Sequence, residues 1–342
     1  MRLTILPTNP PSMLPSMLLR TVRPALRALP WLLLSWACHA GTVDWPTDMP
    51  CGAEQPPAVQ QQTLATAQGQ IGYFRFGHGT PIVLITGYRA SMANWNAAFL
   101  NALAASHEVI VFENRGIGAS LDTPDTLDTR DLPAAPGAGG DPMQAFAHDA
   151  AALIEQLGLR DVTVLGWSMG GAIAQELAVQ APTLVRRLVL MNTLPPGPAG
   201  EAVPPEVMKA LSGNGPDHFR QVMTVLFPDA LVADAMRCFV KDMFRPAGYA
   251  PPSIPPAASG RQERALAAWT RDQAALTALR KVAIPTLILS GSADLVLSPL
   301  NAAALEQTFR DSRWLEVSGG GHAMMYQYPR ELAREIDAFM AR

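Results

Sequence analysis

One stretch of the chain, residues 161–182, constrains the fold more than any other. It opens with a short apolar run typical of a buried strand, and from Met169 its apolar residues recur at helical spacing until Pro182 ends the helix. The pentapeptide GWSMG, residues 166–170, stands between the two elements. A serine on so sharp a turn has a strained backbone, and the flanking glycines let strand and helix approach closely. The stretch therefore predicts a strand–turn–helix unit that exposes the Ser168 hydroxyl at a sheet edge, beside the positive end of a helix.

Apolar runs and helical segments alternate along most of the remaining chain. Strands are predicted at 70–76, 81–85, 108–112, 185–191, 285–290 and 314–317, and helices at 94–106, 146–159, 300–309 and 329–340. Alternating strands and helices favour a parallel sheet covered on both faces by right-handed crossovers. The predicted fold class is therefore α/β, with a mostly parallel central sheet flanked by helices.

The segment 194–279 breaks this alternation. It contains helical pieces separated by prolines and no good strand. An insertion of this size between two core strands predicts a helical lid over the strand ends, where open α/β sheets place their sites. The core then comprises residues 63–193 and 280–342, preceded by an extended lead-in at 41–62. Methionines in the lid and after the last strand are either core filler or the lining of an adaptable apolar pocket: Met208, Met223, Met236, Met243, Met324 and Met325.

Composition limits the class of protein. A chain of 342 residues can bury one large core or two modest ones, and 49% hydrophobic with 16% charged residues is typical of a globular protein. A net charge of −3 gives no reason to expect nucleic acid as a partner. No phosphate-binding glycine loop is evident, and we expect neither a cofactor nor a bound metal.

The N-terminal 40 residues have the pattern of a cleavable signal peptide. Three arginines between positions 20 and 27 precede an apolar run, 28–37, and plausible cleavage positions follow at Cys38 and Ala40. The apolar run is too short to cross a bilayer as a helix. We therefore expect export to the periplasm or beyond, with no membrane span left after processing.

Three alternatives stay open at this end of the chain. The segment can remain uncleaved and associate with the membrane. Met13 or Met17 can be the true start, because residues 1–16 are long for a charged leader. Anchoring as a lipoprotein through Cys38 is a third alternative, although the residues before it resemble a lipobox poorly.

Export would leave two cysteines, Cys51 and Cys238, in the mature chain. Oxidising compartments favour pairing. Their separation in sequence says nothing about their distance in space, so the pairing stays open.

A serine nucleophile needs a base to accept its proton and an acid to orient that base. His322 follows the last predicted strand in a glycine-rich loop that can fold back toward Ser168. Asp294 stands in a turn just beyond the strand at 285–290, whereas the rival Asp311 precedes its strand. The order Ser168, Asp294, His322 predicts a catalytic triad whose members lie at the carboxyl ends of three strands.

Acyl transfer also needs donors for the oxyanion that develops on the substrate. The backbone N–H of Met169, directly after the nucleophile, is one candidate. Tyr88, in the loop after the strand at 81–85, is the candidate for the other.

These motifs together resemble the α/β-hydrolase superfamily over residues 63–342. The sequence ENRGIGAS, from Glu113 onward, is similar to the family's D-x-R-G-x-G-x-S turn, and Gly87 with Trp95 resembles its oxyanion loop. Two positions depart from the pattern: Thr86 stands where the family often has histidine, and Glu113 replaces the usual aspartate. We interpret Glu113 and Arg115 as structural.

The resemblance implies a serine hydrolase that cleaves carboxylic esters of a small to medium, largely apolar molecule through an acyl-enzyme. The serine argues against the family's dehalogenases and epoxide hydrolases, which use aspartate, and its dienelactone hydrolases, which use cysteine. Perhydrolase (haloperoxidase-like), lactone or thioester hydrolase, carbon–carbon bond hydrolase and acyltransferase chemistry remain as alternatives on the same triad. A binding protein without turnover is the alternative from another class.

Overall fold

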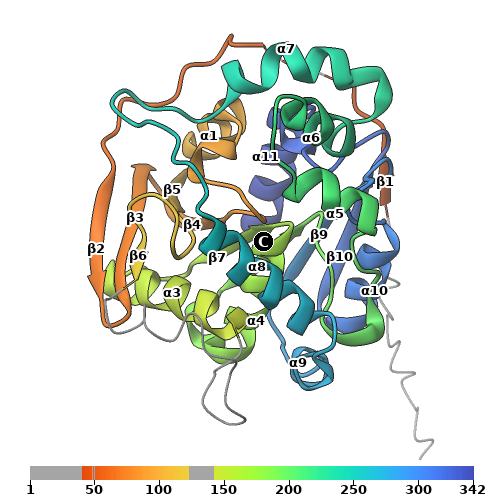
Figure 1. Cartoon of the computed structure of the whole chain (residues 1–342). Helices are drawn as coiled ribbons and strands as arrows, with labels where there is room; N and C mark the ends of the chain where they lie inside the picture. Colours follow the sequence, from red (N-terminus) through yellow and green to blue (C-terminus); the bar gives the residue numbers. More distant parts are fainter. Residues whose placement is uncertain (1–40, 48, 50, 123–141) are drawn as a thin grey trace, which may run out of the picture. The chain divides into compact units, whose positions relative to one another are not determined.

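A single twisted sheet forms the centre of the molecule. The computed structural model describes residues 41–47, 49, 51–122 and 142–342 of the chain (Figure 1). Within them the sheet has ten strands in the order β1-β10-β9-β8-β7-β4-β5-β3-β2, with β6 paired to β3. The pairs from β1 to β5 along this order are parallel, and β3 pairs antiparallel with β5, β2 and β6. The predicted fold class is confirmed.

The strands are β1 (Gly41–Val43), β2 (Gln62–Thr66), β3 (Gly69–Gly77), β4 (Thr80–Ile85), β5 (His107–Phe112), β6 (Leu121–Asp122), β7 (Thr163–Trp167), β8 (Arg187–Met191), β9 (Thr286–Gly291) and β10 (Ser312–Val317). The helices of the core are α1 (Ala97–Ala104), α3 (Pro142–Gln156), α4 (Met169–Gln180), α10 (Leu300–Thr308) and α11 (Pro329–Met340). Those of the segment 194–279 are α5 (Pro205–Ser212), α6 (His218–Leu226), α7 (Val232–Asp242), α8 (Pro256–Trp269) and α9 (Gln273–Leu279).

The direction of chain travel across the sheet places the helices in two layers. From β4 through α1 to β5 the chain moves toward β3, whereas from β7 through α4 to β8 it moves the opposite way. Right-handed crossovers therefore put α1 on one face and α4 on the other. Helix α11 packs against α1, and α3 packs against α4. The residues of β4, β7, β8 and β9 are almost all buried, as expected for strands covered on both sides.

The reversal occurs between the neighbouring strands β4 and β7. In open α/β sheets the crevice beyond the carboxyl ends of two such strands is where ligands bind. The loop after β4 carries Tyr88, and the turn after β7 carries Ser168. The topology thus brings the predicted oxyanion loop beside the predicted nucleophile.

Some elements differ from the sequence-based expectation. The first residues of the predicted lead-in form β1, which extends the sheet by pairing with β10. Three residues are too few to show a hydrophobic period, so this strand is recognised only from its partner. Helix α1 begins at Ala97 rather than 94, because the Asn96 side chain accepts a hydrogen bond from the Phe99 amide (2.9 Å) and caps the helix there. The predicted signal peptide lies outside the described residues.

The segment 194–279 consists of helices and connecting loops, as expected. It makes polar contacts with the loops that follow β4 and β5. The Tyr88 hydroxyl donates to Glu263 Oε1 of α8 (2.6 Å), and the Arg89 amide donates to Gln262 Oε1 (2.9 Å). None of the helices in the described ranges combines the length and apolar character needed to cross a bilayer.

Glu113 is a buried acid where the loop after β5 meets the segment 194–279. It lies just after β5, is 1% exposed, and accepts hydrogen bonds from the Met92 amide (2.9 Å) and from the Tyr249 hydroxyl. Burial raises the pKa of the Glu113 carboxyl to about 7, although both hydrogen bonds oppose this shift. Nearby, Arg115 Nε pairs with Asp149 Oδ2 of α3 (2.8 Å). These contacts agree with a structural role for both residues.

We expect Glu113→Gln to stabilise the protein at alkaline pH. The folded-state pKa lies above that of an unfolded chain, so the wild type loses stability as pH rises from about 4.5 through 7, where the buried carboxyl must ionise. The variant has no such loss, and its free energy of unfolding should exceed that of wild type by roughly 3 kcal/mol at pH 8.5. Urea denaturation of both proteins from pH 4 to 9 measures the difference. A gap that does not change with pH would contradict the assignment.

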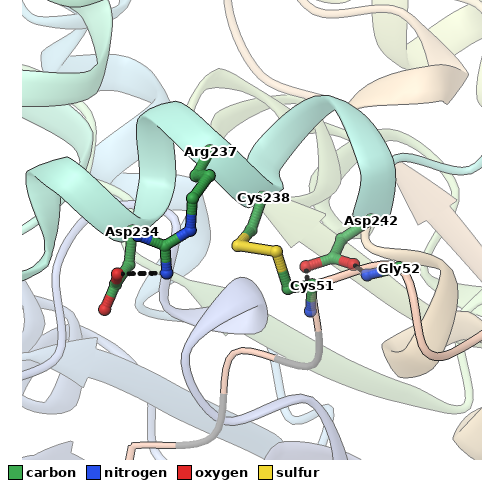
Figure 2. Close-up of a disulfide and its surroundings, with 6 residues drawn as sticks. All are labelled: Cys51, Gly52, Asp234, Arg237, Cys238 and Asp242. Atoms are coloured by element: carbon green, nitrogen blue, oxygen red, sulfur yellow. Dashed lines mark hydrogen bonds and ion pairs between the residues drawn. A yellow bond between two sulfur atoms is a disulfide. The ribbon is translucent and has the colours of Figure 1, made fainter.

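A disulfide joins Cys51 of the lead-in to Cys238 of α7, which answers the question that the sequence left open (Figure 2). The Asp242 carboxylate, one turn further along α7, accepts hydrogen bonds from the backbone amides of Cys51 (3.0 Å) and Gly52. The disulfide at Cys51 and the Asp242 carboxylate, which binds the amides of Cys51 and Gly52, therefore hold this part of the lead-in against one helix.

Replacing both cysteines by serine is expected to lower the free energy of unfolding by about 2–5 kcal/mol, because the bond closes a long loop in the unfolded chain. Urea denaturation of the two proteins, each carrying Cys38→Ser to silence the third cysteine, measures this loss. Reducing agent should lower the free energy of unfolding of the protein with Cys51 and Cys238 to that of the double-serine variant, and it should leave the variant unchanged. A wild-type urea midpoint that does not change when reducing agent is added would show that the disulfide does not contribute to stability.

Candidate active site

Ser168 occupies the sharp turn that the sequence predicts between β7 and α4. Its backbone angles, φ 58° and ψ −125°, lie in a region that side chains other than glycine rarely adopt. The neighbouring glycines are required by close approach: a Cβ on Gly166 would overlap the Gly170 carbonyl, and a Cβ on Gly170 would overlap the Ile85 carbonyl of β4. The Ser168 amide donates to Met191 O (3.0 Å), so the strained turn is tied to the end of β8.

The structure brings the three predicted triad residues together. The Ser168 Oγ lies 2.9 Å from His322 Nε2, and His322 Nδ1 lies 2.8 Å from Asp294 Oδ2. All three are buried, with 8%, 2% and 6% of Ser168, His322 and Asp294 exposed. The second carboxylate oxygen, Asp294 Oδ1, accepts hydrogen bonds from the amides of Val296 (2.8 Å) and Leu297 (2.9 Å). In this arrangement the imidazole donates from Nδ1 to the acid and is free to accept the serine proton at Nε2.

The two predicted oxyanion donors flank Ser168. Met169 is the first residue of α4, where amides have no partner within the helix. The loop after β4 lies against the serine, since a Cβ on Gly87 would come within 3.0 Å of Ser168 Cβ. Within the described chain neither the Tyr88 amide nor the Met169 amide donates a hydrogen bond. Both N–H groups are therefore available to a substrate oxygen.

The departure at Thr86 has a local explanation. Asn114, which follows β5, donates from Nδ2 to both the carbonyl and the hydroxyl oxygen of Thr86 (3.1 Å each). The Thr86 hydroxyl in turn donates to Ala90 O (3.3 Å). A threonine with these partners shapes the oxyanion loop without a histidine.

Asn192 is a functional candidate that the motifs do not include. It follows β8 in the left-handed region, at φ 46°, and is buried. Its Nδ2 donates to the carbonyls of Gly321 (3.0 Å) and His322 (2.9 Å), and its Oδ1 accepts from the Gly291 amide (2.9 Å) at the end of β9. One side chain thus ties the loop of the base to the strand that leads to Asp294. A polar residue directly after a buried strand is the signal that would have identified it.

We expect Asn192→Ala to lower kcat by about 10- to 100-fold with little change in KM, because small displacements of catalytic groups are costly. Asn192→Gly separates the two roles of the residue, since glycine adopts the left-handed conformation but lacks the amide. Steady-state kinetics and melting temperatures of both variants measure the effect. Wild-type kcat in the glycine variant would show that only the backbone conformation matters.

A cavity of about 410 Å³ opens onto the triad. Ser168 and His322 lie in its wall, and most of the remaining wall is apolar and comes from the segment 194–279, including Phe219 of α6 and Phe239 of α7. Of the methionines proposed as lining, Met223 and Met243 face this cavity, and Met208 faces a separate one. No group of His, Cys, Asp and Glu in the described ranges is placed to hold a metal ion.

The fold agrees with that of known proteins. A family model described as alpha/beta hydrolase fold matches residues 80–329. A Synechocystis protein provisionally named a non-heme chloroperoxidase is 29% identical over 284 residues, covering 79% of this chain and 94% of the relative. A protein of Azorhizobium caulinodans provisionally named a carbamate hydrolase is 27% identical over 249 residues, covering 72% and 86%.

Solved structures share the fold. A thermophilic esterase from Thermogutta terrifontis superposes with a TM-score of 0.63 at 21% identity, over 82% of this chain and 98% of the esterase. An alpha/beta hydrolase fold protein from Chitinophaga pinensis gives a TM-score of 0.65 at 20% identity, over 82% and 97%. With a family match over most of its length, the chain belongs to the α/β-hydrolase family.

Proposed function

We propose that this hydrolase cleaves carboxylic esters by a two-step acyl-enzyme mechanism. The observation that carries the proposal is the continuous contact from Ser168 Oγ through the His322 ring to Asp294. Such an arrangement activates a hydroxyl that is otherwise a weak nucleophile.

In the first step Ser168 Oγ attacks the ester carbonyl carbon while His322 Nε2 accepts the hydroxyl proton. The amides of Tyr88 and Met169 bind the oxyanion that forms, and each such donor contributes about 3–4 kcal/mol to transition-state stabilisation. The imidazolium, held by Asp294, then protonates the leaving alcohol as the carbon–oxygen bond breaks. In the second step water gives its proton to His322 and attacks the acyl-enzyme, which releases the acid and restores Ser168.

The cavity supports a small to medium acyl or alcohol group, largely apolar. Because helices of the segment 194–279 form most of its wall, we propose that this segment acts as a lid and selects the substrate while the core supplies the chemistry. Exchanging the segment with that of a related hydrolase should change ester preference and leave Ser168 reactive.

A chain-length series of p-nitrophenyl esters on purified protein, together with labelling by a fluorophosphonate, tests the proposal. Turnover of short and medium esters with label on Ser168 supports it. Label without turnover of any ester points to another acyl chemistry, and absence of label at Ser168 points to a binding protein.

Perhydrolysis is the second candidate, favoured by relatives that carry haloperoxidase names. Hydrogen peroxide would take the place of water on the acyl-enzyme and give a peracid. Peracid formation from acetate and peroxide faster than ester hydrolysis would favour this assignment, whereas product formed only with an added alcohol would indicate an acyltransferase.

We further propose that the chain is exported and that cleavage removes its first 37 to 40 residues. The disulfide supports this, because such bonds persist in oxidising compartments. N-terminal sequencing of the mature protein tests it, and an intact start in the cytoplasmic fraction would count against it.

A further inference from the structure

The active-site cavity has an uneven charge. Among the residues that the structure describes, no aspartate or glutamate forms part of its wall, and Arg89 is the one lining residue with a permanent charge. His218 also lines it, but burial and the nearby arginine lower the pKa of that imidazole, which favours its uncharged form. The pocket that holds Ser168 thus carries a single fixed positive charge among apolar side chains.

Arg89 is held in place by neutral groups. Its backbone lies in the left-handed region, at φ 51°, and its amide donates to Gln262 Oε1. Its Nη1 donates to the carbonyls of Leu211 (3.2 Å), in the last turn of α5, and of Gly213 (3.1 Å), just after that helix. These contacts fix the guanidinium but leave its charge uncompensated.

No carboxylate in the described part of the chain pairs with this half-buried charge. Glu263 accepts a hydrogen bond from the Tyr88 hydroxyl instead, and it is not among the described residues that line the cavity. An ion taken partly out of water without a counter-ion costs free energy, and a guanidinium presents a fork that matches a carboxylate. The ligand itself is the natural source of that missing anion.

We propose that Arg89 binds a carboxylate on the substrate, so that the preferred substrate is an ester with an apolar chain that ends in a free carboxylate. The apolar wall accommodates the hydrocarbon, and Arg89 fixes its charged end. This inference rests on the proposed ester hydrolysis and names the substrate class for it.

A matched pair of esters tests the inference. p-Nitrophenyl hydrogen adipate and p-nitrophenyl hexanoate have six acyl carbons each and differ in the terminal group, and spontaneous hydrolysis is subtracted. We expect Arg89→Met to lower the ratio of kcat/KM for the adipate to that for the hexanoate by about 10- to 100-fold. Arg89→Lys should retain most of the ratio, because it keeps the charge.

Two controls distinguish the effect of removing the Arg89 charge from the effect of loosening the proposed lid. Gln262→Ala removes a neutral contact of the same loop, so both esters should lose rate together and the ratio should hold. Added NaCl should lower the wild-type ratio and leave that of Arg89→Met unchanged, because salt screens a partly exposed charge. The salt series also decides the question if the methionine variant does not fold.

The outcomes separate the two proposals. A wild-type ratio that neither salt nor Arg89→Met alters, with normal hexanoate turnover, overturns the carboxylate site and leaves ester hydrolysis intact. Failure to hydrolyse either ester overturns the proposed function and this inference with it.

Discussion

Ser168→Ala is expected to abolish ester hydrolysis, with a fall in kcat of roughly 10⁶-fold. The serine oxygen forms the bond to the acyl group, and water in its place has neither its position nor its contact with His322. Alanine lacks only the hydroxyl and removes no packing contact of the core, so the melting temperature should change little. Single-turnover and steady-state assays with a p-nitrophenyl ester measure the loss.

His322→Ala serves as the companion variant. Because nucleophile and base act as one unit, it should lose nearly as much as Ser168→Ala, and the double variant should lose no more than either. Near-normal turnover in Ser168→Ala would refute the mechanism.

Asp294→Asn is expected to lower kcat by about 10⁴-fold. The carboxylate accepts the Nδ1 proton of His322 and is itself held by the amides of Val296 and Leu297. An asparagine that turns its NH₂ toward the ring favours the imidazole tautomer that carries its proton at Nε2. In that tautomer Nε2 cannot accept the proton of Ser168. Steady-state kinetics measure this loss.

Asp311→Asn is the matched control, because it removes a carboxylate that also borders a strand but lies before β10 rather than after it. It is exposed, and its carbonyl accepts from Thr286 at the start of β9. Its substitution should leave kcat unchanged. A loss of kcat in Asp311→Asn comparable to that in Asp294→Asn would show that Asp294 is wrongly assigned as the acid of the triad.

Local sequence predicts the parts of this molecule that local geometry determines. The turn at Ser168 is recognisable because its glycines are needed wherever strand and helix approach so closely. The positions of Asp294 and His322 follow from chain order, since the ends of parallel strands meet at one edge of the sheet.

The remaining features depend on contacts between distant segments. β1 is defined by its partner β10, and the bond from Cys51 spans 187 residues to Cys238. No spacing rule predicts such pairs. Asn192 and Arg89 likewise gain their roles from backbone carbonyls of distant segments, which have no signature in sequence.

The lead-in connects the edge of the sheet to a helix that lines the active-site cavity. At one end β1 pairs with β10, the strand that leads to His322. A few residues later Cys51 forms the disulfide with Cys238 of α7. That helix turns Phe239 and Val240 toward the cavity. Breaking the disulfide would remove the covalent tie between the lead-in and this part of the cavity wall, and it would leave the contacts among Ser168, His322 and Asp294 in place. Under the proposed role of the segment 194–279 in selecting the substrate, a reducing environment would lower discrimination between substrates before it lowers reactivity.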